Sequence, residues 1–415
     1  MERILVLAAL IFIFQPASAQ DKMSVIELQQ GALINNPRLH AMQKDVEMAA
    51  RRIDISTSLE DPKLKLGINN LPAGSFSFTM EDMTTKEISI SQMVPVGKLG
   101  SRKEAAVKEY ERAKEILRFE KTDILNMIRM NAYELSYIRL SIGIINEIKK
   151  HLKLVIDSEV AANKTGSGSI GNVIKANIEY NMAEEELIGL RQKEREAVQR
   201  LIYLTGASPD STFSFELVPD FKVITLAEIK TAIVSKNPAL NVVRLDAAIG
   251  REQEAQKRDE YIPDMEVGLS YMQRQDGGGK KRDDMVSGMV TFNIPVWSFG
   301  KNSAMVDEMA KKVEASHLSY VDTLNDLNSR AEILVSQTDK WRDLYRLYGE
   351  KLIPQTELAL ETITARYTSN TSDFMPVIDT LRMLLRYKKE QAMALTSYYT
   401  AYSEINKLMG VEVLQ

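Results

Sequence analysis

Residues Gln92–Gly100 read QMVPVGKLG and join a short alternating segment, KEISIS, to a long charged run that contains no proline. A second junction of the same kind, IPVWSFG, occupies residues 294–300. We call residues 95–100 the first seam and residues 295–300 the second seam. Prolines and glycines recur at offsets of 200 or 201 residues, in the pairs Pro95 and Pro295, Gly100 and Gly300, Pro37 and Pro238, and Pro62 and Pro263. This repeat indicates a duplicated domain.

Each seam marks a point where a strand has to become a helix. Proline ends a strand ladder because it has no backbone N–H to donate, so Pro95 and Pro295 are expected at strand ends. Glycine adopts backbone conformations that other residues avoid, and Gly100 and Gly300 are therefore expected to relieve the bend before the helix begins. An ordinary turn in a soluble protein would explain one seam but not the second copy.

Alternating apolar and polar residues precede both seams and predict one β-hairpin in each half of the chain. The hairpins span residues 62–94 and 263–294, and the run from Met265 to Tyr271 alternates without interruption. Strands of roughly nine or ten residues are long enough to cross a bilayer when tilted. The segment Asp276–Arg282, DGGGKKR, lacks the spacing of a phosphate-binding loop, so we interpret it as an extracellular loop.

Long helices follow each seam. From Ser101 onward, apolar residues recur at alternating steps of three and four, which is the pattern of a coiled-coil face. Sixty helical residues make a rod of roughly 90 Å, too long for a compact globular domain. Small polar residues at 165–171 and 368–373 predict tight turns, and the returning helices end at Gly206 and Gly410, where a helix C-cap favours glycine.

The ends and the composition restrict the class of protein. Residues 1–19 have a basic start, an apolar run from Ile4 to Phe14 and the sequence Ala17-Ser18-Ala19, which is typical of a secretory signal peptide. The chain has no cysteine, so neither disulfides nor a lipid on an N-terminal cysteine are expected. With 53 basic and 57 acidic residues, the charge balance argues against a nucleic-acid partner.

These observations predict two copies of one unit: helix, hairpin, long helix, turn and returning helix. The first repeat spans residues 20–206, a linker spans 207–224, the second repeat spans 225–410, and 411–415 form a C-terminal tail. The predicted fold is mainly α with membrane β, and it has an internal two-fold repeat.

In this order and spacing, the hairpins, the two seams and the segment ARYTSNTSDFMPVIDT at 365–380 make the mature chain resemble the TolC family of outer-membrane factors. The resemblance implies a long coiled-coil α-helical barrel joined to a β-barrel that a homotrimer shares, with four strands from each chain. Strand arithmetic agrees with sharing, because eight strands are the observed minimum for such barrels. Two chains would give a filled barrel, and three would give twelve strands and a lumen.

The same resemblance implies a function and partners. The protein is expected in the outer membrane of a Gram-negative bacterium, in contact with its lipid and extending into the periplasm. It would be the exit duct of a tripartite efflux or type I secretion system, passively conducting solutes from a periplasmic adaptor and an inner-membrane pump. Heavy-metal efflux is one possible branch of the family, and the sequence does not select the substrate.

Two kinds of site follow from the resemblance. The helical turns would meet the adaptor, through the small residues Thr165, Gly166, Ser167, Gly168, Ser369, Asn370, Thr371 and Ser372. Asp379 aligns with an aspartate that faces the threefold axis at the closed end of the family's duct, whereas a second such aspartate is replaced by Pro376. Three carboxylates close together would bind a cation or retain a proton. A solvated Asp379, or one paired with Lys175 of the first repeat, stays open as an alternative.

No catalytic constellation or cofactor motif is present, and we expect no enzyme activity and no bound metal. His40, His151 and His317 lie apart on helical segments without the spacing of metal ligands. The pairs Met80 with Met83 and Met127 with Met130 could in principle hold a soft ion, but methionine is also a common packing residue. A second hypothesis is a soluble periplasmic coiled-coil scaffold or adaptor, with small sandwich modules built from the alternating segments.

Overall fold

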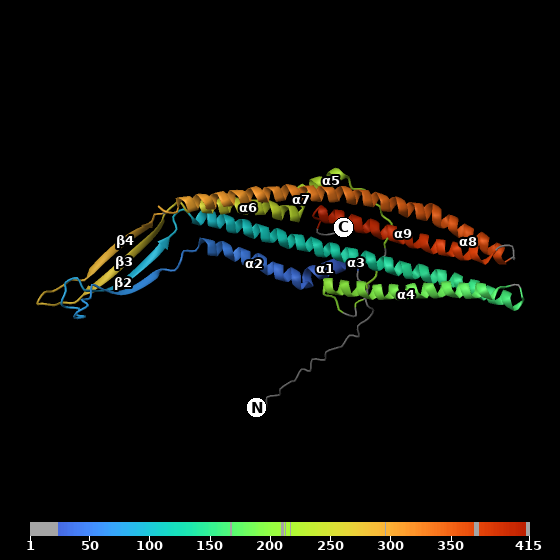
Figure 1. The fold of residues 1–415 in the computed structure, drawn as a ribbon, viewed down its shortest axis with the longest axis horizontal. Coiled ribbons are helices and arrows are strands. Elements are labelled where there is room, and N and C mark those ends of the chain that lie inside the picture. The colour runs from blue at the N-terminus through green and yellow to red at the C-terminus, as the bar shows by residue number, and fades with distance from the viewer. Residues whose placement is uncertain are drawn as a thin grey trace, which may run out of the picture.

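The computed structural model describes residues 24–166, 168–208, 211, 213–215, 217–294, 296–368 and 373–411. It is a long rod of helices with a β-sheet at one end and helical turns at the other (Figure 1). Several predicted features lie outside the described residues: the signal peptide 1–19, the last four tail residues, and Ser167, Pro295, Ser369, Asn370, Thr371 and Ser372.

The elements appear in the same order twice. The first repeat contains α1 (Val25–Asn35), α2 (Pro37–Thr57), β1 (Lys63–Asn69), β2 (Thr85–Val94), α3 (Leu99–Lys164) and α4 (Ile170–Thr205). The second contains α5 (Leu226–Lys236), α6 (Pro238–Asp259), β3 (Asp264–Arg274), β4 (Met285–Asn293), α7 (Phe299–Leu347), the π-helical segment η1 (Tyr348–Leu352), α8 (Ile353–Thr368) and α9 (Phe374–Leu408).

One antiparallel sheet, in the order β1-β2-β3-β4, contains both hairpins. The central pairing of β2 with β3 joins the two repeats and places Ile90 opposite Leu269 and Ile88 opposite Tyr271. Because side chains alternate between the two faces of a strand, this register puts the aliphatic and aromatic residues of all four strands on one face, and methionines such as Met285 and Met289 on the other. The sheet therefore has four strands per chain, as the sequence predicts.

The first seam turns at a different glycine from the one that the sequence suggests. Strand β2 ends at Val94, directly before Pro95, and Gly97 adopts a left-handed backbone conformation with φ 73°. Gly100 and Gly300 instead lie within the first turns of α3 and α7, with open space around the position of an added Cβ. The bend is therefore made before the helix begins, at Gly97.

Around α3, the other helices pack in two sets. Near the sheet, α2 and α6 contact α3, and α7 contacts α6; farther along the rod, α4 and α9 contact α3, and α8 contacts α9. The predicted coiled-coil face of α3 is mostly buried, through Ile124, Ile128, Leu135, Ile138, Ile145, Leu152 and Ile156. None of the helices in the described part of the chain is long and apolar enough to cross a membrane.

Two asparagines connect these sets end to end. Asn36 caps the start of α2, and its side-chain amide donates a hydrogen bond of 2.9 Å to the Leu204 carbonyl at the end of α4. Asn237 caps α6 in the same way and donates at 2.9 Å to the Leu408 carbonyl at the end of α9. Each asparagine thus pairs at least one backbone N–H group at the start of one helix and a backbone carbonyl at the end of another. Left unpaired, these groups would cost free energy. The end of α4 thus adjoins the start of α2, and the end of α9 adjoins the start of α6 (Figure 1).

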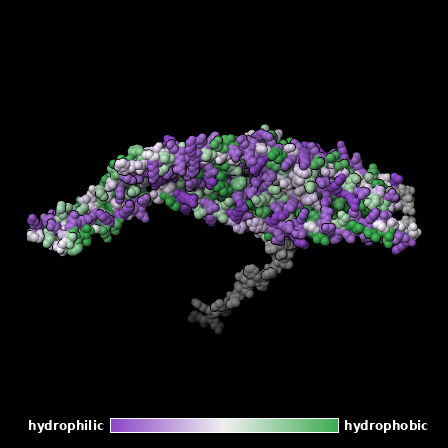
Figure 2. Space-filling view, viewed as in Figure 1, coloured by the Kyte–Doolittle hydropathy of each residue, from purple (hydrophilic) through white to green (hydrophobic). Residues whose placement is uncertain are grey.

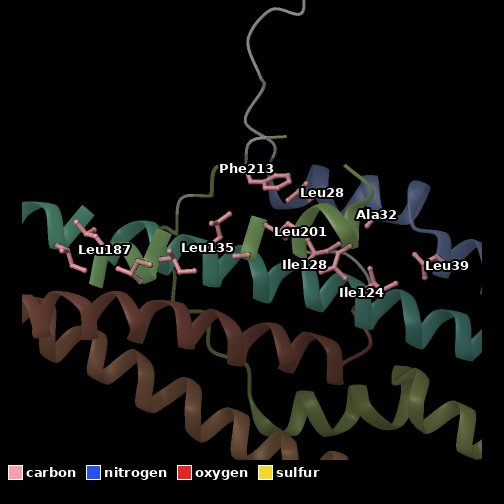
Figure 3. Packing of buried hydrophobic residues seen from close by; sticks show 14 of the residues in the cluster. Leu28, Ala32, Leu39, Ile124, Ile128, Leu135, Leu187, Leu201 and Phe213 are labelled. Carbon is pink, nitrogen blue, oxygen red and sulfur yellow. The ribbon is translucent and has the colours of Figure 1, made fainter. Parts of the chain in front are cut away.

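The largest described core cluster lies where α1, α3 and α4 meet, and includes Leu28, Ile128, Leu187, Leu201 and Phe213 (Figure 3). The repeat offset is 200 residues at the starts of α3 and α7 but 204 at the turns. The π-helical segment η1 absorbs part of this insertion, because a π-bulge adds a residue within a helix.

Candidate channel wall, tip and gate

The two faces of the sheet differ in chemistry. One face carries exposed apolar side chains from all four strands: Leu64, Leu66, Ile68, Ile88, Ile90, Val267, Leu269, Tyr271, Val286, Val290 and Phe292. The opposite face carries hydrogen-bonded polar side chains, such as Lys65 and Asn69 on Glu87, and Ser91 on Glu266 at 2.6 Å. Figure 2 shows hydrophobic residues along the lower edge of the sheet end, mixed with hydrophilic ones, and further hydrophobic patches along the rod. Such a sheet can separate lipid from water.

At the far end of the sheet, the two hairpin loops are fastened together. The side chain of Arg282 is only 8% exposed, forms an ion pair of 2.5 Å with Asp82, and donates to the carbonyls of Thr79 and Gln275. A side chain at Gly277 would collide with the Thr79 backbone, whereas Gly278 faces open space. The Asp276–Arg282 segment is therefore one part of a packed double loop with an exposed crest.

The opposite end of the rod holds the predicted tip. The helix α3 ends at Lys164, the cap residue Thr165 is exposed, and Gly166 has φ 78°. Gly168 is packed against the end of α3, and no side chain fits at this position. A Cβ there would lie 2.5 Å from the Asn163 backbone nitrogen. A bulky residue at Gly168 would consequently disturb the turn itself.

Asp379 lies on the second turn of α9, and its side chain is 58% exposed. It forms an ion pair of 3.2 Å with Arg382, whose Nε also donates at 3.0 Å to Glu179 of α4. This second contact is the main cause of the raised pKa of Arg382. The partner that the structure gives to Asp379 is thus Arg382, and sequence spacing could not reveal its link to Glu179, 203 residues away.

A cavity of about 240 Å³ adjoins this ion-pair chain, lined mainly by apolar residues of α3, α4 and α9. Farther along the rod, Met127 and Met130 meet Met393 in a groove of about 380 Å³. Within the described residues, no group of His, Asp and Glu side chains is arranged to hold a metal ion. His40 contacts the carbonyl of Ile34 at 2.8 Å.

A two-faced sheet continued by a rod of antiparallel helices is the architecture that the sequence analysis expects for an outer-membrane factor. The chain matches the model of the family "Outer membrane efflux protein" twice, over residues 28–207 and 231–411. It belongs to this family of outer-membrane efflux proteins.

Individual relatives agree with this assignment. The chain is 19% identical over 424 residues to "Outer membrane protein TolC" of Escherichia coli strain K12, covering 95% of this chain and 83% of that protein. Among solved structures, VceC from Vibrio cholerae matches with a TM-score of 0.78 at 16% identity, covering 93% of this chain and 96% of VceC. The outer-membrane channel OprN also gives 0.78, at 14% identity, covering 94% of this chain and 93% of OprN.

The family and the fold confirm the prediction of a TolC-type protein, with its helical-barrel and shared β-barrel architecture, in the outer membrane. They also support a general role as the exit channel of efflux. The alternative of a soluble periplasmic scaffold is not compatible with an outer-membrane location and is set aside.

Proposed function

We propose that three copies of this chain close one barrel and one helical rod, and that the assembly is the passive exit duct of a tripartite machine. An inner-membrane pump and a periplasmic adaptor would deliver the solute, and the duct would conduct it across the outer membrane. Efflux and type I secretion are both compatible with such a wall, because the substrate is selected at the pump.

The observation that carries this proposal is the pair of open sheet edges. Within the described residues, β1 pairs only with β2, and β4 pairs only with β3, so each leaves one edge of backbone N–H and C=O groups unpaired. Open edges do not occur in a bilayer, since the hydrocarbon offers no hydrogen-bond partners. Another copy can satisfy both edges if its β1 pairs with β4. Three copies supply twelve strands, which leaves room for a lumen.

Purified protein in detergent and in planar bilayers tests the proposal. The mass of the solubilised particle should equal three chains, and its addition to a bilayer should produce long-lived conducting steps. A monomeric particle that never conducts would overturn the duct. Topology can be tested separately with a tag after Gly278, where the structure leaves open space; the tag should be reachable on intact cells.

We further propose that the helical turns dock the adaptor, as the family resemblance implies. The support is the exposed position of Thr165 and Gly166 at the end of the rod farthest from the sheet (Figure 1). Thr165→Arg should reduce export while the trimer forms normally. Thr231→Arg, at an exposed threonine of α5 away from the tip, serves as the matched charge change. Normal export by an assembled Thr165→Arg variant would argue against docking at this turn.

Finally, we propose that Asp379 lines the narrowest point of the resting duct. Its exposed carboxylate near the tip supports this role, and Arg382 would limit the repulsion between the three copies. Asp379→Ala should change cation selectivity or cation block in single-channel recordings. Unchanged conductance and selectivity would remove Asp379 from the gate and leave it as a solvated ion-pair residue.

A further inference from the structure

Inside one chain, the two repeats meet where α3 packs on α6, and charged side chains mark this contact. Arg112 of α3 forms an ion pair of 2.5 Å with Asp246 of α6. One turn earlier on α3, Lys108 forms its ion pair with Glu111 at 2.9 Å, and Glu252 of α6 lies near it without pairing with it. The pKa of Lys108 is raised first by its hydrogen bond to Glu111, and the charge of Glu252 adds to the shift.

The internal repeat predicts where these contacts recur. Helices α3 and α7 begin 200 residues apart, and α2 and α6 begin 201 residues apart. Both correspondences run through unbroken helix to the charged positions. Arg112 therefore corresponds to Lys312, and Asp246 to Asp45. Lys108 corresponds to Glu308, and Glu252 to Arg51.

Both derived pairs are complementary in charge. Lys312 with Asp45 keeps the signs of the internal pair, whereas Glu308 with Arg51 reverses them and still attracts. All four side chains are exposed in the single chain, and α2 and α7 form its opposite flanks (Figure 1). Their contacts within the chain are replaceable: Arg51 lies 3.7 Å from Asp54, and Lys312 donates to Gln253.

The sheet gives an independent check of this correspondence between the two repeats. Inside the chain, Gln92 lies opposite Val267, and Ile90 lies opposite Leu269. The same offsets place Phe292 of β4 opposite Leu66 of the next copy's β1, and Val290 opposite Ile68. All four residues belong to the apolar face described above. The derived register thus continues that face from one copy to the next, whereas a shift by one residue would place apolar residues on the polar face.

We propose that Lys312 and Glu308 on α7 of one copy form ion pairs with Asp45 and Arg51 on α2 of the next copy. This inference rests on the proposed trimer and names the contacts that set its register. Charge pairs at a partly exposed interface contribute more to orientation and partner choice than to affinity. One such pair changes subunit association by about twofold to fivefold per interface.

Charge reversal tests the pair directly. Asp45→Lys and Lys312→Glu should each lower the fraction of trimer in detergent at low salt, because each replaces an attraction by a repulsion. The double variant Asp45→Lys with Lys312→Glu should restore the trimer. The matched control combines Asp45→Lys with Lys311→Glu; Lys311 has the same charge, lies one position away on α7 and pairs with Glu314. This control should not restore the trimer.

Cross-linking provides a second readout. Because the chain has no cysteine, Arg51→Cys with Glu308→Cys introduces the only thiols. A short thiol-specific reagent should then link chains into dimers and trimers, and neither single variant should form a trimer ladder. A wild-type trimer with no rescue and no cross-linking would overturn these contacts and leave the duct intact. A wild-type monomer would overturn both the trimer and the contacts.

Discussion

The first seam lies between the two repeats of one chain, whereas the second seam lies on a free flank. At the first seam, Lys98 is buried and reaches Asp264 at 2.9 Å and Glu260 at 3.5 Å. The residues equivalent to Gly97 and Lys98 at the second seam are Trp297, which is 96% exposed, and Ser298. Two copies of one junction therefore differ in both size and charge.

The difference follows from what each seam packs against. Gly97 approaches Ile262 at the junction of α6 and β3, so its seam is closed by residues of the same chain. Trp297 has no such cover within the described residues. A large amphipathic ring at the end of a membrane strand is typical of the interface between lipid and water. The internal seam is thus built for a packed contact, and the flank seam for lipid or another copy.

Among substitutions at the two seams, the removal of Lys98 should cause the largest loss in the free energy of unfolding. Lys98→Ala leaves Asp264 and Glu260 without their shared cation, and a fully buried pair broken in this way costs about 3–5 kcal/mol. Because both acids are partly exposed, we expect a smaller loss of about 2 kcal/mol in the free energy of unfolding. Ser298→Ala at the second seam should cost less than about 0.5 kcal/mol.

Thermal unfolding in detergent, followed by the helical circular dichroism signal, measures both variants. Equal losses at the two seams would contradict the contrast.

Backbone strain at Gly97 gives the next effect. Gly97→Ala places a Cβ on a residue with φ 73°, and a non-glycine residue in this region costs about 1–2 kcal/mol. The added Cβ would also lie 3.3 Å from Ile262, although the end of that side chain can move. Trp297→Ala should change the unfolding free energy of the single chain by less than about 0.5 kcal/mol. A Gly97→Ala variant as stable as the wild type would show that the backbone at Gly97 does not require glycine.

These two seams also show what sequence reasoning can reach. The 200-residue repeat, the period of two before each seam and the three-four pattern after it are local signals, and they predict the sheet and the long helices. The motif VPVGKLG contains two glycines, and no local rule tells which one adopts positive φ. The burial of Lys98 depends on Asp264, far away in the sequence, and so it requires the tertiary contact.

The candidate tip and gate likewise combine features that the sequence predicts with features that depend on tertiary contacts. The positions of the turns and of Asp379 can be proposed from order and resemblance. The chain of Asp379, Arg382 and Glu179 cannot, because it joins α9 to α4 across the two repeats. The constraint on Gly168 is also invisible in the sequence, since a flexible exposed turn and a tightly packed one both use glycine.

The helix junctions should behave alike, in contrast to the seams. Asn36→Ala removes the cap of α2 and the hydrogen bond to the end of α4, and Asn237→Ala removes the cap of α6 and the hydrogen bond to the end of α9. Each should cost about 1 kcal/mol. Serine at either position keeps the acceptor for the cap but loses the amide donor, so it should recover part of the loss. Urea unfolding of the four variants checks this. A difference above about 0.5 kcal/mol between the two alanine variants would show that the asymmetry of the seams extends into the helices.

The smallest effect is expected at Gly100 and Gly300, and its sign is informative. If these glycines relieved the bend, alanine would destabilise both seams. The structure instead places them in the first turns of α3 and α7, with open space around each added Cβ. Alanine restricts the unfolded chain more than glycine and favours a helix, so Gly100→Ala should stabilise the chain by about 0.5 kcal/mol.

Gly300→Ala should give the same gain when the unfolding of the single chain is measured, because the local geometry is the same. Its position on the free flank adds a second test, since a neighbouring copy could occupy the space beside it. Dissociation of the trimer should therefore be measured along with unfolding. A gain in unfolding free energy at both positions, with weaker trimers only for Gly300→Ala, would place the second seam against another copy. Unchanged trimers would show that the surface beside Gly300 faces water or lipid. A loss of stability at both positions would show that the two glycines are needed for the bend.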